Sequence, residues 1–171
     1  MRYFFMSAAL LAMAAAGCVA TKGGHAIIQG TEPASKLSGA ATFTKTASGV
    51  KAVIHVAGAP AGVHAIHIHE HGRCEDLGKA AGTHFNPAAV KHGFLPKDGP
   101  AAAHAGDMGN ITVDKNGRGS LTLELPGLTL DQSTRGIAGR SVILHEKLDD
   151  FGQPTGNAGG RIGCGIIQVD N

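Results

Sequence analysis

Residues 62–70 read GVHAIHIHE, and this stretch carries the pattern that decides both fold and chemistry. Successive side chains of a β-strand point to opposite faces, so Ile66 and Ile68 share one face while His67 and His69 share the other, about 6.6 Å apart. The isoleucines can face a hydrophobic core. The two imidazoles then project outward from a rigid strand, close enough together to bind one metal ion. Since no apolar packing role explains them, we interpret the pair as metal ligands.

Similar alternation extends over most of the chain after residue 25 and predicts eight strands. Turn signals separate them, including the sequence DKNG at 114–117 and LPG at 125–127. We find no helix-period segment of useful length after residue 20 and no internal repeat. These features predict an all-β protein, an eight-stranded antiparallel Greek-key β-barrel or sandwich with long metal-binding loops. The predicted strands are 26–30, 40–45, 51–57, 64–70, 110–113, 119–125, 141–145 and 165–169.

The amino-acid composition indicates a single small domain and argues against nucleic acid binding. The chain has 171 residues, enough for one domain and an appendage, and its 26 glycines without tryptophan indicate many tight turns around a modest aliphatic core. Fifteen Lys and Arg against 13 Asp and Glu give a net charge of +2, with no basic run. Nucleic acid is therefore not an implied partner. Ten histidines are an excess for this length and direct attention to metals.

The N-terminus has the features of an export signal. Residues 1–18 contain one early arginine, an apolar run and an end made of small residues, a pattern typical of a bacterial signal peptide. The last four residues, AAGC, resemble a lipobox in which Cys18 would be acylated; ordinary cleavage nearby is the alternative. We expect a signal peptide at 1–18, a flexible tether at 19–25 and one domain at 26–171. The expected location is the periplasm, with a lipid anchor to a membrane if Cys18 is acylated.

Two cysteines remain after the signal region, Cys74 and Cys164. Disulfides persist in an oxidising compartment, so we expect one bridge between them rather than two unrelated buried thiols.

Residues 71–106 contain no clean strand or helix, and so long a loop in a compact domain needs something to order it. Three histidines and one aspartate supply three nitrogens and one carboxylate oxygen, a full tetrahedral set for zinc: His84, His92, His104 and Asp107. A third imidazole, His145, ends an apolar run and could join His67 and His69. Copper in a tetragonal field prefers a fourth imidazole, which a ligand shared between the two ions could supply.

Six motifs, in this order, resemble the copper/zinc superoxide dismutase family, and the match runs from about residue 26 to the C-terminus. They are GVHAIHIHE (62–70), GTHFNP (82–87), KHG (91–93), HAGDMGN (104–110), VILHEK (142–147) and GGRIGCG (159–165).

The resemblance implies one copper ion and one zinc ion per subunit. It implies copper ligands at His67, His69 and His145, a bridging imidazolate at His84, and further zinc ligands at His92, His104 and Asp107. It also implies a disulfide between Cys74 and Cys164, an arginine beside copper at Arg161, and a carboxylate at Asp149 that links ligands of the two metals. His64 corresponds to a structural histidine, whereas His25, His55 and His71 receive no role.

The resemblance implies an oxidoreductase that disproportionates the superoxide anion to dioxygen and hydrogen peroxide. Copper would cycle between Cu(II) and Cu(I), and zinc would have a structural role. His84 would accept and return a proton, and Arg161 would hold the anion near copper. The alternative is an exported copper/zinc-binding protein on the same fold without catalysis. Such a relative would typically lack a copper ligand or the arginine, and both are present here. The subunit could be a monomer or a homodimer.

Residues 151–160 contain no charged side chain, so the steering charges usual in this part of the family are absent. We expect Lys79, Lys91 or Lys97 in the long loop to substitute for them.

Overall fold

The computed structural model describes residues 23–170, so the predicted signal peptide, Cys18 and most of the tether lie outside the described residues. The described part is almost entirely β-structure. Its elements are β1 (Gly23–Gly30), β2 (Ser38–Lys45), β3 (Gly49–Ala57), β4 (Gly62–His69), η1 (Lys79–Ala81), α1 (Leu95–Asp98), β5 (Asp107–Val113), β6 (Gly119–Pro126), β7 (Ser141–His145), β8 (Arg161–Ile166) and β9 (Gln168–Val169).

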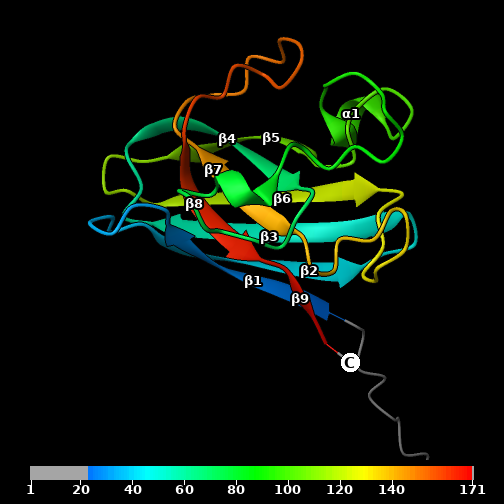
Figure 1. Ribbon diagram of the computed structural model, residues 1–171, viewed down its shortest axis with the longest axis horizontal. Coiled ribbons are helices and arrows are strands. Elements are labelled where there is room, and N and C mark those ends of the chain that lie inside the picture. The colour runs from blue at the N-terminus through cyan, green and yellow to red at the C-terminus, as the bar shows by residue number, and fades with distance from the viewer. Residues whose placement is uncertain (1–22, 171) are drawn as a thin grey trace, which may run out of the picture.

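The strands form one closed antiparallel barrel. The order of hydrogen-bonded neighbours is β2-β3-β6-β5-β4-β7-β8-β1, and β1 also pairs with β2, which closes the sheet. The short β9 adds a pairing beside β1. Because β3 lies next to β6 rather than β4, the connections follow a Greek-key path, as predicted. Figure 1 shows the barrel strands side by side, with the segment that carries α1 and the orange connection between β7 and β8 on its upper side.

Only β7 has the predicted boundaries, and the other strands differ from them by one to four residues; β1, for example, begins at Gly23 instead of residue 26. Two of the differences have a clear physical reason. The predicted strand 165–169 is divided, because the buried Ile167 turns its N–H to the carbonyl of Arg140 and separates β8 from β9. Strand β5 begins at Asp107 instead of residue 110. Its first three residues are all buried, so both faces are covered and no alternation of polar and apolar side chains reveals the strand.

Strand β4 joins the core to the candidate site. Ile66 and Ile68 are fully buried and belong to the main hydrophobic core, as the alternation predicts. His67 and His69 lie on the opposite face, yet only 0% and 1% of their surfaces are exposed. The outward face of β4 is therefore covered, and the covering segments include the long loop between β4 and β5. That loop is irregular apart from η1 and α1. In the described part of the chain, no helix has the length and apolar character needed to span a membrane.

Candidate metal centre

Four histidines from three parts of the chain converge on one side of the barrel. Strand β7 pairs with β4, so His145 at the end of β7 comes beside the two histidines of β4. The Nε2 atoms of His69 and His145 lie 3.3 Å apart. His84 from the long loop completes the group, and its backbone forms an isolated bridge with His69. We call this group the four-histidine cluster; its ligand atoms all lie within 4.8 Å of one another: His67, His69, His84 and His145.

A second group, the Asp107 cluster, shares one member with the first. Oδ1 of Asp107 lies 3.0 Å from Nδ1 of His84, 3.0 Å from Nδ1 of His92 and 3.2 Å from Nδ1 of His104. The ligand atoms of these four side chains also lie within 4.8 Å of one another. His84 belongs to both clusters, as the sequence hypothesis of a shared imidazole requires.

The side chains fit a pair of metal ions. Nδ1 of His67 is buried and lacks a hydrogen-bond partner among the described residues. An unpaired buried nitrogen is costly, and coordination to a metal removes that cost. Four imidazoles suit copper, whereas three imidazoles and one carboxylate suit zinc.

A carboxylate outside both clusters connects them. Oδ2 of Asp149 accepts a hydrogen bond of 2.8 Å from Nε2 of His67, and its Oδ1 lies 2.9 Å from Nε2 of His92. Asn110 fixes the backbone of Asp149, because its amide oxygen accepts from Asp149 N at 2.7 Å and its amide nitrogen donates to Asp149 O at 3.0 Å. This is the arrangement by which a carboxylate orients metal-binding imidazoles.

Comparison with known proteins decides the family. The profile described as copper/zinc superoxide dismutase matches residues 37–167. The chain belongs to this family. It is 38% identical over 150 residues to a Cu-Zn superoxide dismutase of Deinococcus radiodurans, with 80% of each chain covered. It is also 38% identical over 151 residues to Cu-Zn superoxide dismutase 2 of Aquifex aeolicus, covering 84% of this chain and 85% of that one.

A solved structure, that of the clock protein EA4, is also similar. It has a TM-score of 0.77 and 33% sequence identity, and the match covers 92% of this chain and 100% of EA4. Family membership confirms the predicted activity: the enzyme is a superoxide dismutase that uses copper and zinc.

Burial keeps most of the site imidazoles of this dismutase neutral. It lowers the pKa of His84 to about 4 and that of His145 to about 3. The pKa of His69 is also well below its ordinary value, first because the ring is buried and then because His84 lies nearby. Neutral imidazole is the form that binds a metal, so at neutral pH these rings need lose no proton first.

His92 is different, because it lies between two carboxylates. Burial acts to lower its pKa, but Asp107 and Asp149 outweigh burial and raise it to about 9. The pKa values of both carboxyl groups lie below their usual range: burial would raise them, and hydrogen bonds from the histidines more than compensate.

The dismutase has an open cavity of about 580 Å³ over the four-histidine cluster. His69, His84 and His145 line it together with Arg161 and Lys147. The predicted steering lysines, Lys79, Lys91 and Lys97, are not among the residues that line it. Lys147 was missed from the sequence, although it stands two residues after His145.

Arg161 is fixed at the cavity by three short hydrogen bonds. Its Nη1 and Nη2 donate to the carbonyls of Gly78 and Gly82, each at 2.6 Å. The hydroxyl of Thr31 donates to the backbone carbonyl of Arg161, also at 2.6 Å. Partial burial lowers the pKa of Arg161, but an arginine stays charged at neutral pH. Thr31 lies 130 residues away in the chain, and no sequence signal indicated its contact with Arg161.

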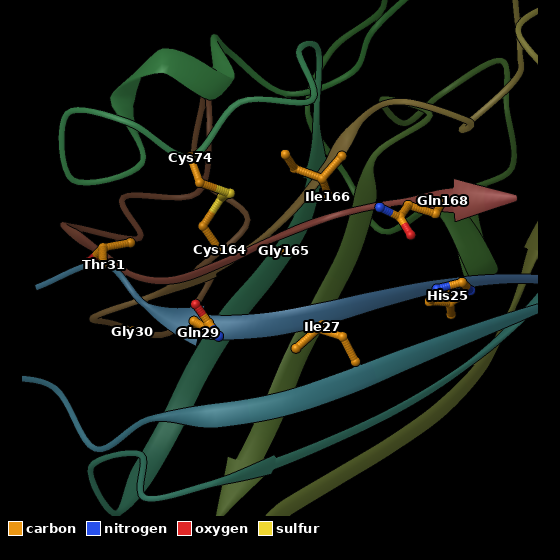
Figure 2. A pocket seen from close by; sticks show the side chains of 10 residues that line it. All are labelled: His25, Ile27, Gln29, Gly30, Thr31, Cys74, Cys164, Gly165, Ile166 and Gln168. Atoms are coloured by element: carbon orange, nitrogen blue, oxygen red, sulfur yellow. A yellow bond between two sulfur atoms is a disulfide. The ribbon is translucent and has the colours of Figure 1, made fainter.

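The predicted disulfide between Cys74 and Cys164 is present and ties the start of the long loop to β8. It fixes the segment that carries the Gly78 and Gly82 carbonyls. Figure 2 shows this bond at one end of a second cavity, of about 410 Å³, with Thr31 close to it and Ile27 and Ile166 along the strands. No histidine of the two clusters lines this second cavity, so it is separate from the metal centre.

Proposed function

We propose that the four-histidine cluster binds the copper of this dismutase and that the Asp107 cluster binds its zinc. The observation that carries this assignment is the place of His84, which belongs to both clusters. Nδ1 of His84 lies 3.0 Å from Oδ1 of Asp107, which leaves Nε2 for the four-histidine side. The ligands are His67, His69, His84 and His145 for copper, and His84, His92, His104 and Asp107 for zinc.

Copper, when bound, supplies the one-electron redox couple that the reaction needs, whereas zinc has a closed d shell and holds geometry. The chain supplies proton transfer and anion binding. His84 lines the cavity, so its Nε2 can hold a proton and deliver it as one of the two that hydrogen peroxide carries away, while solvent in the open cavity supplies the other. On the other side of the ring, Nδ1 of His84 and the carboxylate of Asp107 would hold zinc together, and this shared ion would keep the imidazole oriented.

Arg161 binds the superoxide anion in the cavity. Its guanidinium is planar and permanently charged, and the Gly78 and Gly82 carbonyls fix its orientation. A lysine would provide charge without the paired N–H groups that hold this orientation. The presence of Arg161 beside a complete set of metal-type ligands under an open cavity favours catalysis over metal storage.

Replacement of His145 by alanine tests the copper assignment. We expect His145→Ala to lose copper and to lose dismutation by more than about 100-fold, a larger loss than the 10- to 100-fold typical of an outer-shell partner, while zinc is retained. The matched control is His55→Ala, because His55 is exposed on β3 and belongs to neither cluster. Dismutation and metal content are measured on the same samples. Full activity with copper still bound to His145→Ala would show that the assignment is wrong.

We also propose that the mature enzyme works in the periplasm as one domain over residues 26–171, after export directed by residues 1–18. The disulfide supports this location, because such bonds persist in oxidising compartments. Acylation of Cys18 would tether the enzyme to a membrane. Intact mass spectrometry of the mature protein tests the tether: a lipidated Cys18 at the N-terminus supports it, and an unmodified N-terminus elsewhere contradicts it.

A further inference from the structure

The backbone of His92 is held by the side chain of Gln153. The N–H of His92 donates to Oε1 of Gln153 at 3.1 Å, and Nε2 of Gln153 donates to the carbonyl of His92 at 2.9 Å. The two residues are 61 positions apart in the chain. One amide thus pairs with both polar groups of a single residue's backbone, as a neighbouring strand would do.

No other partner serves these two backbone groups within residues 23–170. His92 lies in a stretch of the long loop without helix or strand, so no ladder of backbone hydrogen bonds fixes its position. Buried backbone groups need partners, and Gln153 supplies both. The ring of His92 is held separately through Nε2 by Asp149, which leaves Nδ1 facing Oδ1 of Asp107 at 3.0 Å.

The segment that carries Gln153 passes close over the same histidine and then reaches the substrate cavity. Gly156 packs against Asp149, and a Cβ atom at this position would also come within 2.8 Å of Nε2 of His92. Beside and beyond it, four residues of the segment line the cavity: Thr155, Asn157, Ala158 and Gly159. Gln153 therefore lies where the Asp107 cluster meets the rim of the cavity.

We propose that Gln153 is a positioning residue for the zinc ligand His92, and that it couples zinc binding to the order of residues 151–160. The proposal rests on the assignment of His92 to zinc under Proposed function. Gln153 limits the backbone positions of His92 to those in which Nδ1 points at the zinc site. The coupling is reciprocal: if Gln153 favours zinc binding, bound zinc must in turn favour the docked position of the segment that carries Gln153.

The experiment compares Gln153→Met with Gln132→Met. Methionine preserves the length of the side chain and removes its hydrogen bonds, and Gln132 is an exposed glutamine that forms no side-chain hydrogen bond within the described residues. Zinc is titrated into protein stripped of metal, in competition with a coloured chelator. We expect Gln153→Met to bind zinc about 10-fold more weakly or worse, the range typical of losing an outer-shell partner, and Gln132→Met to bind as wild type does.

Hydrogen exchange gives a second readout that does not depend on activity. In wild type, binding of zinc alone should slow hydrogen exchange at the His92 amide and over residues 151–160. In Gln153→Met, the His92 amide should exchange faster than in wild type. Zinc should then no longer slow exchange over residues 151–160. A lower melting temperature of Gln153→Met without a change in zinc affinity would overturn the proposal, because it would indicate a merely structural role. Unchanged affinity and unchanged His92 exchange would overturn it as well.

His92→Ala, titrated in parallel, distinguishes a wrong zinc-ligand assignment from a wrong role for Gln153. If His92→Ala binds zinc as wild type does, the ligand assignment itself is wrong. If His92→Ala loses zinc while Gln153→Met does not, the ligand assignment stands and the role of Gln153 is rejected.

Discussion

Asp149 accepts a hydrogen bond of 2.8 Å from Nε2 of His67, and neither side chain is exposed to solvent. The same carboxylate holds Nε2 of His92, so one side chain orients an imidazole of each cluster. This relationship makes the two metal sites dependent on a residue that belongs to neither cluster.

We therefore expect Asp149→Asn to weaken both sites. The amide cannot accept hydrogen bonds at both of its ends, so one of the two imidazoles loses its partner, and losing an outer-shell partner typically costs 10- to 100-fold in metal affinity. Copper and zinc affinities are measured separately by chelator competition. Asp76→Asn is the control, because Asp76 is an exposed carboxylate with no side-chain hydrogen bond among the described residues. Equal affinities in Asp149→Asn and wild type would contradict the linking role.

Removal of the disulfide should release Arg161 before it affects the metal clusters. The Cys74–Cys164 bond closes a separation of 90 residues, for which the chain-entropy model gives about 4–5 kcal/mol of stability. In a Cys74→Ser/Cys164→Ser double variant, we expect faster hydrogen exchange over 74–82, where Gly78 and Gly82 hold the guanidinium. Turnover per bound copper should fall. Unchanged exchange over 74–82 after loss of the bond would count against this anchoring.

Lys147 is the cationic side chain that lines the cavity beside Arg161, and it should attract the substrate over a distance. We expect Lys147→Ala to lower kcat/KM roughly two- to fivefold at low ionic strength, with a smaller loss at high salt, where screening already weakens the field. Lys79→Ala removes the same charge at a residue outside the cavity lining and is the control. A salt dependence in Lys147→Ala as steep as in wild type would exclude Lys147 as a steering residue.

Zinc binding should release a proton from His92. The pKa of His92 is raised to about 9, so in protein stripped of metal the ring is protonated at pH 7 and must lose a proton before Nδ1 can bind zinc. His84, with a pKa of about 4, is already neutral. Zinc affinity should therefore rise about tenfold per pH unit from pH 7 towards pH 9. Calorimetry at pH 7 in buffers of different ionisation enthalpy counts the protons; a count of zero would contradict this prediction.

The sequence was sufficient to predict the barrel and both clusters because the relevant signals are local or carried by family motifs. Alternation in β4 distinguishes Ile66 and Ile68 from His67 and His69, and burial confirms the apolar side. The burial of the two histidines could not be predicted, since it depends on how the long loop folds back over the strand.

The residues that orient the site were harder to find. Thr31 and Gln153 have common polar side chains, and each acquires its role through a hydrogen bond to backbone, across 130 and 61 positions of the chain respectively. A backbone partner leaves no residue-type signature, so neither contact follows from spacing or composition. Lys147 was missed for another reason: it follows the end of β7, and its place beside the cavity becomes apparent only once the cavity residues between 155 and 159 are located.

The most direct test of the account is a crystal structure of the oxidised, fully metallated enzyme, with copper and zinc located by anomalous scattering at their own absorption edges. We predict that the ring of His84 contacts both ions, zinc through Nδ1 and copper through Nε2, with His67, His69 and His145 completing the copper site. A His84 ring that contacts only one ion, or neither, would contradict the shared-ligand centre.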